Sequence, residues 1–523
     1  MAAQDPTAPP TAARPDDRAA TTAAQMAVLT AARATTAVPT EALTAARVTT
    51  VAPTPARAAT VAPMVVPTAA RAVALDPVAA TAARTVALTA VPTVERAVGP
   101  TAVPMAVRVG EQPLSAGRSP DRPALRRCIS AEPGEFASVH WGRAPLLSKA
   151  ADLAKPFDDL LTLTDVDELL SRRGLRSPFL RVARDGAVLG SWQFTRGGGV
   201  GAEIADQVAD DKVTRLFDDG STLVLQALHR LWPPLIDFGG GLGVDLGHPV
   251  QINAYITPPS SRGFSAHYDV HDVFVLQLDG RKRWLIHAPV HPDPLRDQPW
   301  DRRRAAVEAR AAEEPLIDTA LEPGDALYLP RGYLHSATAL GGVSAHLTVG
   351  VHVLTRYAIV EALLKLAGGL PELRATLPLG IDAADPDQLA PHIAEVVAEL
   401  GRLAPDSGAV ARVLRDLVWQ GTRPSPVSPL AQVAAARAVA AGTRVKVRPG
   451  LRFRLDARDG RVLLDIPGDQ LSLPETTAAA LAELLSGEPC VVGRIGGLPV
   501  ADQIVLVRRL LREAILVPMG DVV

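Results

Sequence analysis

The sequence predicts a mixed α+β protein in which a double-sheet jelly roll is preceded by a disordered tail and followed by helices and a winged helix. From about Val250 the chain breaks into many short strand-like runs separated by turns, which is the pattern of a jelly roll. After Tyr357, apolar residues recur at helical spacing. From about Ala431, strand-like runs are followed by two helical stretches, and this order suits a winged-helix module.

The first 120 residues have a low-complexity composition of Ala, Thr, Pro, Val and Arg, with near-repeats such as TAARATTAVPT. Prolines recur too often for a long helix. Large apolar and aromatic residues are nearly absent, so little surface could be buried against the entropy cost of ordering. We therefore expect residues 1–120 to be disordered. A repeat solenoid is the alternative, but the units lack Leu or Phe anchors and a fixed period.

The globular part begins near Ala124, and we divide it into residues 121–355, 356–428 and 429–523, which hold the jelly roll, the helical region and the winged helix. Helical pattern is expected in FASVHWGRAPLL, in PFDDLLTLTDVDELLSRRG and in STLVLQALHRLWPPL. Strands are expected in QINAYIT, SAHYD, VFVLQLDG, RKRWLIHAP, ALYLP and SAHLTVGVHVL. Asp279-Gly280 lies between two of these runs and is a signal for a tight hairpin.

Composition excludes several classes of function. The chain has 523 residues and a formal net charge of -2, which does not indicate a partner such as nucleic acid or an anionic membrane. Its two cysteines, Cys128 and Cys490, lie in unrelated contexts, which argues against a disulfide framework and fits a reducing cytosol. There is no run of about 18 apolar residues and no secretion signal, so we expect a cytoplasmic protein without a membrane span.

The residues that carry chemistry are His267, Asp269 and His335. Residues i and i+2 of a strand point to the same side, so His267 and Asp269 can reach one ion together. His335 follows the strand ALYLP, where a turn can aim it back into the mouth of the barrel. Two imidazoles and one carboxylate are the facial triad of non-heme Fe(II) oxygenases, which leaves coordination positions open for a cosubstrate and O2. The alternative is that all three are solvated or surface side chains.

Three further histidines lie near this pattern. His271 is two residues after Asp269, so on a strand its side chain points to the same side as those of His267 and Asp269. It is either a residue that supports these ligands, a rival ligand, or a partly exposed polar residue. We interpret His346 and His352, on a later strand, as hydrogen-bonded barrel histidines rather than ligands.

Lys282 is the second informative position, because the 54 basic residues are overwhelmingly arginine. It lies on the strand that follows Asp279-Gly280. A dicarboxylate cosubstrate needs a cation opposite its far carboxylate, and a buried lysine supplies a compact point charge. The alternative is that Lys282, between Arg281 and Arg283, is one of three solvated edge charges.

Residues 136–147, NAYITPPSSRGFSAHYDVHDVFVLQLDGRKRW and PGDALYLPRGYLH resemble the JmjC-type ribosomal oxygenases, a cupin-like family that hydroxylates ribosomal proteins. The resemblance covers about residues 125 to 520. It implies a double-stranded β-helix that binds Fe(II) and 2-oxoglutarate, a helical dimerisation region and a C-terminal winged helix.

By motif position, the resemblance makes His267, Asp269 and His335 the iron ligands and Lys282 the partner of the 2-oxoglutarate C5 carboxylate. It also places two residues of the strand QINAYIT, Asn253 and Tyr255, where the family lines its pocket near cosubstrate and substrate.

Two positions depart from the family pattern and bear on the substrate. Family members often carry an acidic or apolar residue where this chain has His271, and a small hydroxyl residue can stand where it has Gly350. The winged-helix segment mixes acidic and basic residues, so nucleic-acid binding by it is not expected.

These features predict an Fe(II)- and 2-oxoglutarate-dependent hydroxylase that is a homodimer and acts on a protein side chain, such as a histidine or arginine of a ribosomal protein. A peptide or a small natural product is an alternative substrate, and demethylation is an alternative chemistry. The rival functions are a cupin metalloenzyme that needs no 2-oxoglutarate and a metal-binding scaffold without catalysis.

Overall fold

The computed structural model describes residues 121–184, 186–201, 203–259, 261, 265–404 and 406–520. The tail predicted to be disordered, residues 1–120, lies outside this range. Within it, no helix is long and apolar enough to cross a bilayer.

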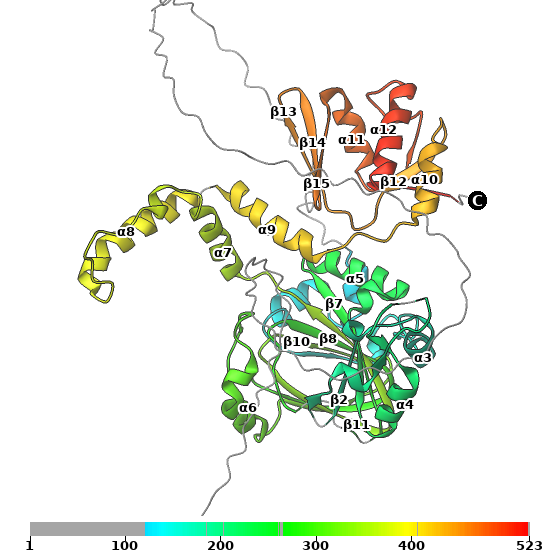
Figure 1. Cartoon of the computed structure of the whole chain (residues 1–523), viewed down its shortest axis with the longest axis vertical. Coiled ribbons are helices and arrows are strands. Elements are labelled where there is room, and N and C mark those ends of the chain that lie inside the picture. Colours follow the sequence, from blue (N-terminus) through cyan, green and yellow to red (C-terminus); the bar gives the residue numbers. More distant parts are fainter. Residues whose placement is uncertain are drawn as a thin grey trace, which may run out of the picture. The chain divides into compact units, whose positions relative to one another are not determined.

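Helices precede or alternate with the first strands of the sheet, and α3, α4 and α5 are labelled in Figure 1. They are α1 (Pro123–Arg126), α2 (Pro133–Glu135), η1 (Phe136–His140), α3 (Leu163–Arg172), α4 (Asp210–Asp218) and α5 (Pro233–Leu246). Single helical turns occur at η2 (Ala150–Asp152), η3 (Ser177–Phe179), η4 (Ser191–Gln193), η5 (Leu228–Arg230) and η6 (Trp300–Arg303), the last followed by α6 (Arg304–Ala311). Helix α3 begins with a capping box in which Thr162 and Asp165 satisfy each other's backbone amides.

A nine-stranded antiparallel sheet forms the centre, in the order β1-β10-β8-β11-β7-β6-β2-β3, with β9 paired to β8. Its strands are β1 (Leu146–Ser148), β2 (Leu180–Arg184), β3 (Ala187–Val188), β6 (Thr222–Leu225), β7 (Val250–Thr257), β8 (Asp272–His287), β9 (Ile317–Leu321), β10 (Ala326–Leu329) and β11 (Leu334–Val351). β4 (Thr195–Arg196) and β5 (Gln207–Val208) pair separately. The mixed α+β class is therefore confirmed, with a core of antiparallel strands.

The long strands β8 and β11 pair over nearly their whole length, from Leu334 opposite His287 to Val351 opposite Asp272. The first half of β8 also pairs with β10 and its second half with β9. One long strand thus takes part in two different strand groups, which lets the sheet bend around an inner face. The wrapped arrangement of β7, β8, β10 and β11 is visible in Figure 1.

The hairpin predicted at Asp279-Gly280 is wrong, because both residues lie inside β8. The register of β8 against β11 shifts beside Asp279, which marks a bulge. Gly280 has φ of 61°, and a Cβ there would lie 2.0 Å from the carbonyl oxygen of Val343. Gly280 does adopt the positive φ that a tight turn would require. A β-bulge requires the same backbone conformation, so the residue type alone could not distinguish the two structures.

The stretch from Ser221 begins with a strand, β6, and not with the predicted helix. All four residues of β6 are buried, and a short run that is apolar on both sides has no periodicity to separate strand from helix. After the single turn η5, the α-helical part of this stretch starts only at Pro233, the first residue of α5. Likewise, the helix expected from Phe136 ends at His140, and Leu146–Ser148 form β1.

Alternation along the strands separates two packed faces. Phe274 and Leu276 of β8 join Leu347 of β11 in the large core under the helices. The neighbouring Val273 and Val275 face a smaller cluster together with Trp284 and Ile286. Because side chains of a strand alternate between faces, polar residues in register with the second set point toward the inside of the bent sheet.

The predicted helical region contains three long helices, α7 (Arg356–Ala367), α8 (Pro386–Leu403) and α9 (Ser407–Gly421), with a short turn η7 (Glu372–Arg374).

The C-terminal segment has its own core, which includes Leu464, Leu481, Val507 and Leu516. It consists of α10 (Pro429–Arg437), β12 (Arg444–Val447), β13 (Arg454–Arg458), β14 (Arg461–Ile466), β15 (Asp469–Pro474), η8 (Glu475–Thr477), α11 (Ala478–Leu484), β16 (Cys490–Val491), α12 (Val500–Arg512) and β17 (Leu516–Pro518). Its strands form two three-stranded sheets, β16-β12-β17 and β13-β14-β15. Its assignment as a winged helix stays a prediction.

Candidate metal and cosubstrate site

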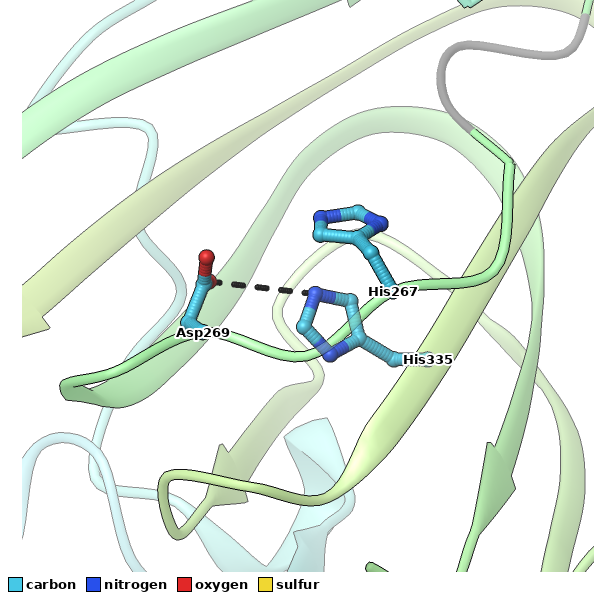
Figure 2. Close-up of side chains that lie close together, drawn as sticks. All are labelled: His267, Asp269 and His335. Carbon is cyan, nitrogen blue, oxygen red and sulfur yellow. Dashed lines mark ion pairs between the residues drawn. The ribbon is translucent and has the colours of Figure 1, made fainter. Parts of the chain in front are cut away.

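His267, Asp269 and His335 converge on one point (Figure 2). One ligand atom from each lies within 4.8 Å of the others. His335 Nε2 is 3.8 Å from Asp269 Oδ2, and the two imidazole centroids are 4.4 Å apart. The three side chains that the sequence selects therefore can share one ion.

Backbone hydrogen bonds fix this arrangement. His267 N donates to His335 O at 3.2 Å, and His335 N donates to His267 O at 2.8 Å. Gly332 N donates to Asp269 O at 3.0 Å, which attaches the turn before β11 to the segment before β8. The ligands thus lie on backbone that is held from both sides and not on independent loops.

Each imidazole is oriented by a backbone carbonyl. The Nδ1 atom of His267 lies 2.7 Å from Ser265 O, and the Nδ1 atom of His335 lies 3.1 Å from Tyr333 O. A carbonyl accepts, so each Nδ1 carries the proton and Nε2 carries the lone pair. This arrangement of a ligating imidazole and an oriented second nitrogen is the usual one in metal sites.

The electrostatics favour the protonation states that bind metals. Burial raises the pKa of Asp269, but the nearby His271, His335, His267 and Arg181 outweigh it, so the pKa is lowered and the carboxylate is ionised. Burial, with a contribution from His267, lowers the pKa of His335 to about 4, so its imidazole is neutral near pH 7.

Lys282 is buried, with 3% of its surface exposed. Its Nζ donates to Thr257 Oγ1 at 3.0 Å, and among the described residues no carboxylate pairs with it. Burial lowers its pKa to about 7. Its neighbours Arg281 and Arg283 instead point outward to Glu322 and Asp318, so the reading of Lys282 as a third solvated edge charge is wrong.

His346 differs from the hydrogen-bonded barrel histidine that the sequence suggested. It is 3% exposed, and its buried Nδ1 has no partner within the described part of the chain. Its ring stacks on Tyr255 at 5.1 Å and meets Trp284 edge-on at 5.4 Å. Burial first, and Lys282 second, lower its pKa. The sequence did contain a signal for this orientation. His346 alternates with apolar residues along β11, so its side chain points toward the inner face of the bent sheet.

Asn253 and Tyr255 lie on the same face of β7 as Thr257, in an alternating pattern. Asn253 Oδ1 accepts a hydrogen bond from Ala227 N at 3.0 Å, which supports the left-handed backbone of that residue. Burial raises the pKa of Tyr255, and Arg181 opposes this. The binding roles of Asn253 and Tyr255 stay predictions.

Residues 244–359, which contain this whole ligand set, match the family model of the JmjC domain. The chain carries a JmjC domain. The JmjC part of the predicted resemblance is thereby confirmed, and the expectation of Fe(II) and 2-oxoglutarate agrees with this domain and with the His-Asp-His group.

The curated relatives are similar over this same part. Ribosomal oxygenase 1 of Rattus norvegicus is 32% identical over 230 residues, which is 40% of this chain and 38% of the rat protein. The bifunctional lysine-specific demethylase and histidyl-hydroxylase NO66 of Drosophila persimilis is 35% identical over 189 residues, 32% of this chain and 26% of the fly protein. The chain thus spans well under half the length of these relatives.

Among solved structures, the chain is similar to the Escherichia coli ribosomal oxygenase YcfD, with a TM-score of 0.44 and 18% identity. The match covers 75% of this chain and 99% of the E. coli protein. That protein has also been solved in complex with cobalt and 2-oxoglutarate.

Proposed function

We propose that this protein is an Fe(II)- and 2-oxoglutarate-dependent oxygenase that hydroxylates a protein side chain. Two observations carry the proposal. One is the His-Asp-His group, and the other is Lys282 on β8, the strand that pairs with the strand of His335, which is a buried cation without a carboxylate partner among the described residues. A buried unpaired ammonium is costly unless an anionic ligand offsets the cost.

The chain's own residues fit both groups. His267, Asp269 and His335 would hold the ion through two nitrogens and one oxygen, a donor set suited to Fe(II). Lys282 would bind the far carboxylate of 2-oxoglutarate, with Thr257 and His346 beside it as hydrogen-bonding groups. When bound, iron and 2-oxoglutarate supply the activation of O2, and the protein positions the substrate C–H and excludes water.

A protein side chain is the favoured substrate, because the relatives are described as ribosomal oxygenases and as a histidyl-hydroxylase. A ribosomal protein is accordingly the first substrate to test. Lysine demethylation is the second candidate chemistry, since the same fly relative is also described as a demethylase. A peptide or small natural product would use the same site.

The test is a turnover assay followed by mass spectrometry. Purified protein with Fe(II) and 2-oxoglutarate should form succinate, and ribosomal proteins from cells lacking it should lose a mass shift of one oxygen. Absence of succinate, with the biological role intact in His267→Ala, would support the scaffold function instead. Metal-dependent turnover without 2-oxoglutarate would support the rival cupin enzyme.

We also propose that residues 356–428 form a homodimer interface. The three helices of this region expose large apolar side chains, which are unusual on a monomer surface in such number. They include Tyr357, Ile359, Val360, Leu364, Ile393, Val396, Val397 and Leu417. Light scattering should give twice the chain mass, and Val397→Glu should reduce it. A monomeric wild-type protein would contradict the proposal.

A cytoplasmic location is part of the same proposal. It is supported by the two cysteines of the chain, Cys128 and Cys490, which are both buried and unpaired.

A further inference from the structure

The orientation of His335 depends on the turn that precedes β11, residues 330–333. The carbonyl of Tyr333 lies 3.1 Å from Nδ1 of His335, so this carbonyl sets the angle of the imidazole. The amide of the preceding residue, Gly332, donates to the carbonyl of Asp269 at 3.0 Å. Two of the three metal-group residues are therefore linked through the backbone of one turn.

The side chain of Asp272 holds the earlier part of this turn. Asp272 is fully buried at the start of β8, and its Oδ1 accepts a hydrogen bond from the amide of Arg331 at 3.0 Å. Nη1 of Arg331 lies 3.6 Å from the same oxygen, so the guanidinium supplies a countercharge to the buried carboxylate. Asp272 follows Asp269 by three residues, and it thus attaches the turn of His335 to the segment that carries Asp269.

The second oxygen of Asp272 is held from β10. Tyr328 is fully buried, and its Oη donates to Asp272 Oδ2 at 2.6 Å. The same Oη accepts a hydrogen bond from the amide of Gly142 at 2.8 Å, so its one proton is directed at the carboxylate. Burial first, and Asp272 second, raise the pKa of Tyr328, so the phenol keeps this proton.

The ring of Tyr328 is itself fixed by packing. It meets Phe136 edge-on at a centroid distance of 4.9 Å and lies 5.0 Å from the ring of Phe274. Both oxygens of Asp272 therefore accept from donors whose positions are set by other elements of the fold. A fully satisfied buried polar network of this kind restricts the backbone that it holds to one arrangement.

We propose that Asp272 is a positioning residue of the metal site and that it sets the orientation of His335 relative to Asp269. It acts through the turn of residues 330–333, and Tyr328 and the amide of Arg331 hold its carboxylate. Asp272 is not one of the three ligand residues. The inference rests on the proposed function, since it concerns the same metal site.

The physical reason is the number of acceptors that the side chain offers. A carboxylate presents an acceptor oxygen to each of its two donors, whereas asparagine has one acceptor and one donor group. In Asp272→Asn, either the hydroxyl of Tyr328 or the amide of Arg331 would face an NH2 group. A buried donor without an acceptor is costly, so the turn would move and His335 would lose its orientation.

Asp325 offers a matched control, because it is a buried carboxylate of the same kind. It is 2% exposed, and it accepts hydrogen bonds from Lys149 Nζ and from the amides of Ala150 at 2.8 Å and Glu322 at 2.9 Å. These contacts hold a turn that carries none of the three metal-group residues. Asp325→Asn thus removes an acceptor from a buried network without changing the turn of His335.

The experiment titrates the full chain with Co(II) alone. The visible absorption spectrum of bound Co(II) reports the geometry of its ligands, and the titration gives the affinity. Denaturant titrations of the metal-free proteins measure the free energy of unfolding separately. The variants are Asp272→Asn, Tyr328→Phe and Asp325→Asn, each compared with the wild type.

Asp272→Asn should weaken Co(II) binding by about 10–100-fold, the range for groups that orient metal ligands, and should change the spectrum. Tyr328→Phe keeps the packed ring and the carboxylate and removes one hydrogen bond, so it should shift both readouts in the same direction by a smaller factor. Asp325→Asn should lower the free energy of unfolding but leave the Co(II) affinity and spectrum as in the wild type.

Two results would overturn the inference. One is wild-type affinity and spectrum in Asp272→Asn and Tyr328→Phe. The other is an equal loss of Co(II) affinity in Asp325→Asn, because lost stability alone would then explain the effect. If Asp272→Asn does not fold, Tyr328→Phe decides. Wild-type protein that binds Co(II) but forms no succinate with Fe(II) and 2-oxoglutarate would instead contradict the proposed function, and the Co(II) series would still decide the role of Asp272.

Discussion

His267 and His335 form an isolated antiparallel bridge in which each backbone amide donates to the other's carbonyl. This contact joins the segment before β8 to the start of β11 and brings the two rings to a centroid distance of 4.4 Å. The metal group therefore depends on strand pairing as much as on its three side chains. An irregular loop would lose backbone conformational entropy when it bound the metal. Paired backbone is already ordered before the metal binds, so this entropy loss does not weaken metal binding.

Replacing Asp269 by asparagine should lower the affinity for Fe(II) by roughly 100-fold or more, since even the outer partners of metal ligands contribute about 10–100-fold. Equilibrium dialysis with Fe(II) under anaerobic conditions measures this. The control is Asp279→Asn, which changes an exposed carboxylate of β8 in the same way. Equal affinities of the two variants would show that the group does not hold the ion.

Replacing Lys282 by methionine should weaken 2-oxoglutarate binding by roughly 10–100-fold, the range expected for a lost charged hydrogen bond. The same variant should not lower the unfolding free energy of the ligand-free protein, because it removes a buried charge that has only Thr257 as a partner. Arg281→Met, at an exposed position of β8, is the control. If both variants bound 2-oxoglutarate as the wild type does, Lys282 would have no role in its binding.

Binding of 2-oxoglutarate should weaken as pH rises above about 7, because the lowered pKa of Lys282 makes the ligand-free side chain neutral above that value. The slope can reach about tenfold per pH unit for one coupled proton. Calorimetric titration with Mn(II)-loaded protein between about pH 6 and pH 9 measures it. In Lys282→Arg the charge persists at all these values, so a variant with the same slope as the wild type would assign the titration to another group.

The ligand-free protein should become more stable as pH rises, whereas its binding of 2-oxoglutarate becomes weaker. Between about 7 and the ordinary value of 10.5, the unfolded chain keeps a proton on Lys282 that the folded chain has released. The unfolding free energy should therefore rise with pH across this window. In denaturant titrations, the free energy of unfolding of Lys282→Met should exceed that of the wild type by an amount that shrinks from about pH 7 upward. If this difference in free energy stayed constant with pH, it would contradict the lowered pKa of Lys282.

Gly280→Ala should reduce the unfolding free energy by about 2–4 kcal/mol, since it combines a positive-φ penalty with a clash. The added Cβ would lie 2.0 Å from Val343 O, so the bulge between β8 and β11 would have to open. The matched control is Gly342→Ala in β11, where a Cβ would meet nothing within 4 Å. A common unfolding midpoint for both variants would mean that the bulge is not needed.

Much of the site follows from local pattern. The spacing of His267 and Asp269 identifies two ligands on one side of the chain. Lys282 could be selected because lysine is rare among the basic residues of this sequence. His346 was misread because its surroundings come from β7 and from the second half of β8, which sequence distance does not reveal. The strand β6 was misread for a related reason, because burial on both faces removes the alternation on which sequence reading depends.

Residue types and short spacings were enough to predict the kinds of ligand atom and the class of the fold, and the Asp279-Gly280 signal marked the position where the chain has a positive φ. The folded arrangement was needed to show that Asp279-Gly280 is a bulge and that Lys282 and His346 are both buried, with Lys282 lowering the pKa of His346. It also decided that the ring of His271 occupies the space left by Gly350. These features depend on which strands pair and in which register, and register is set by burial over the whole sheet rather than by any short segment.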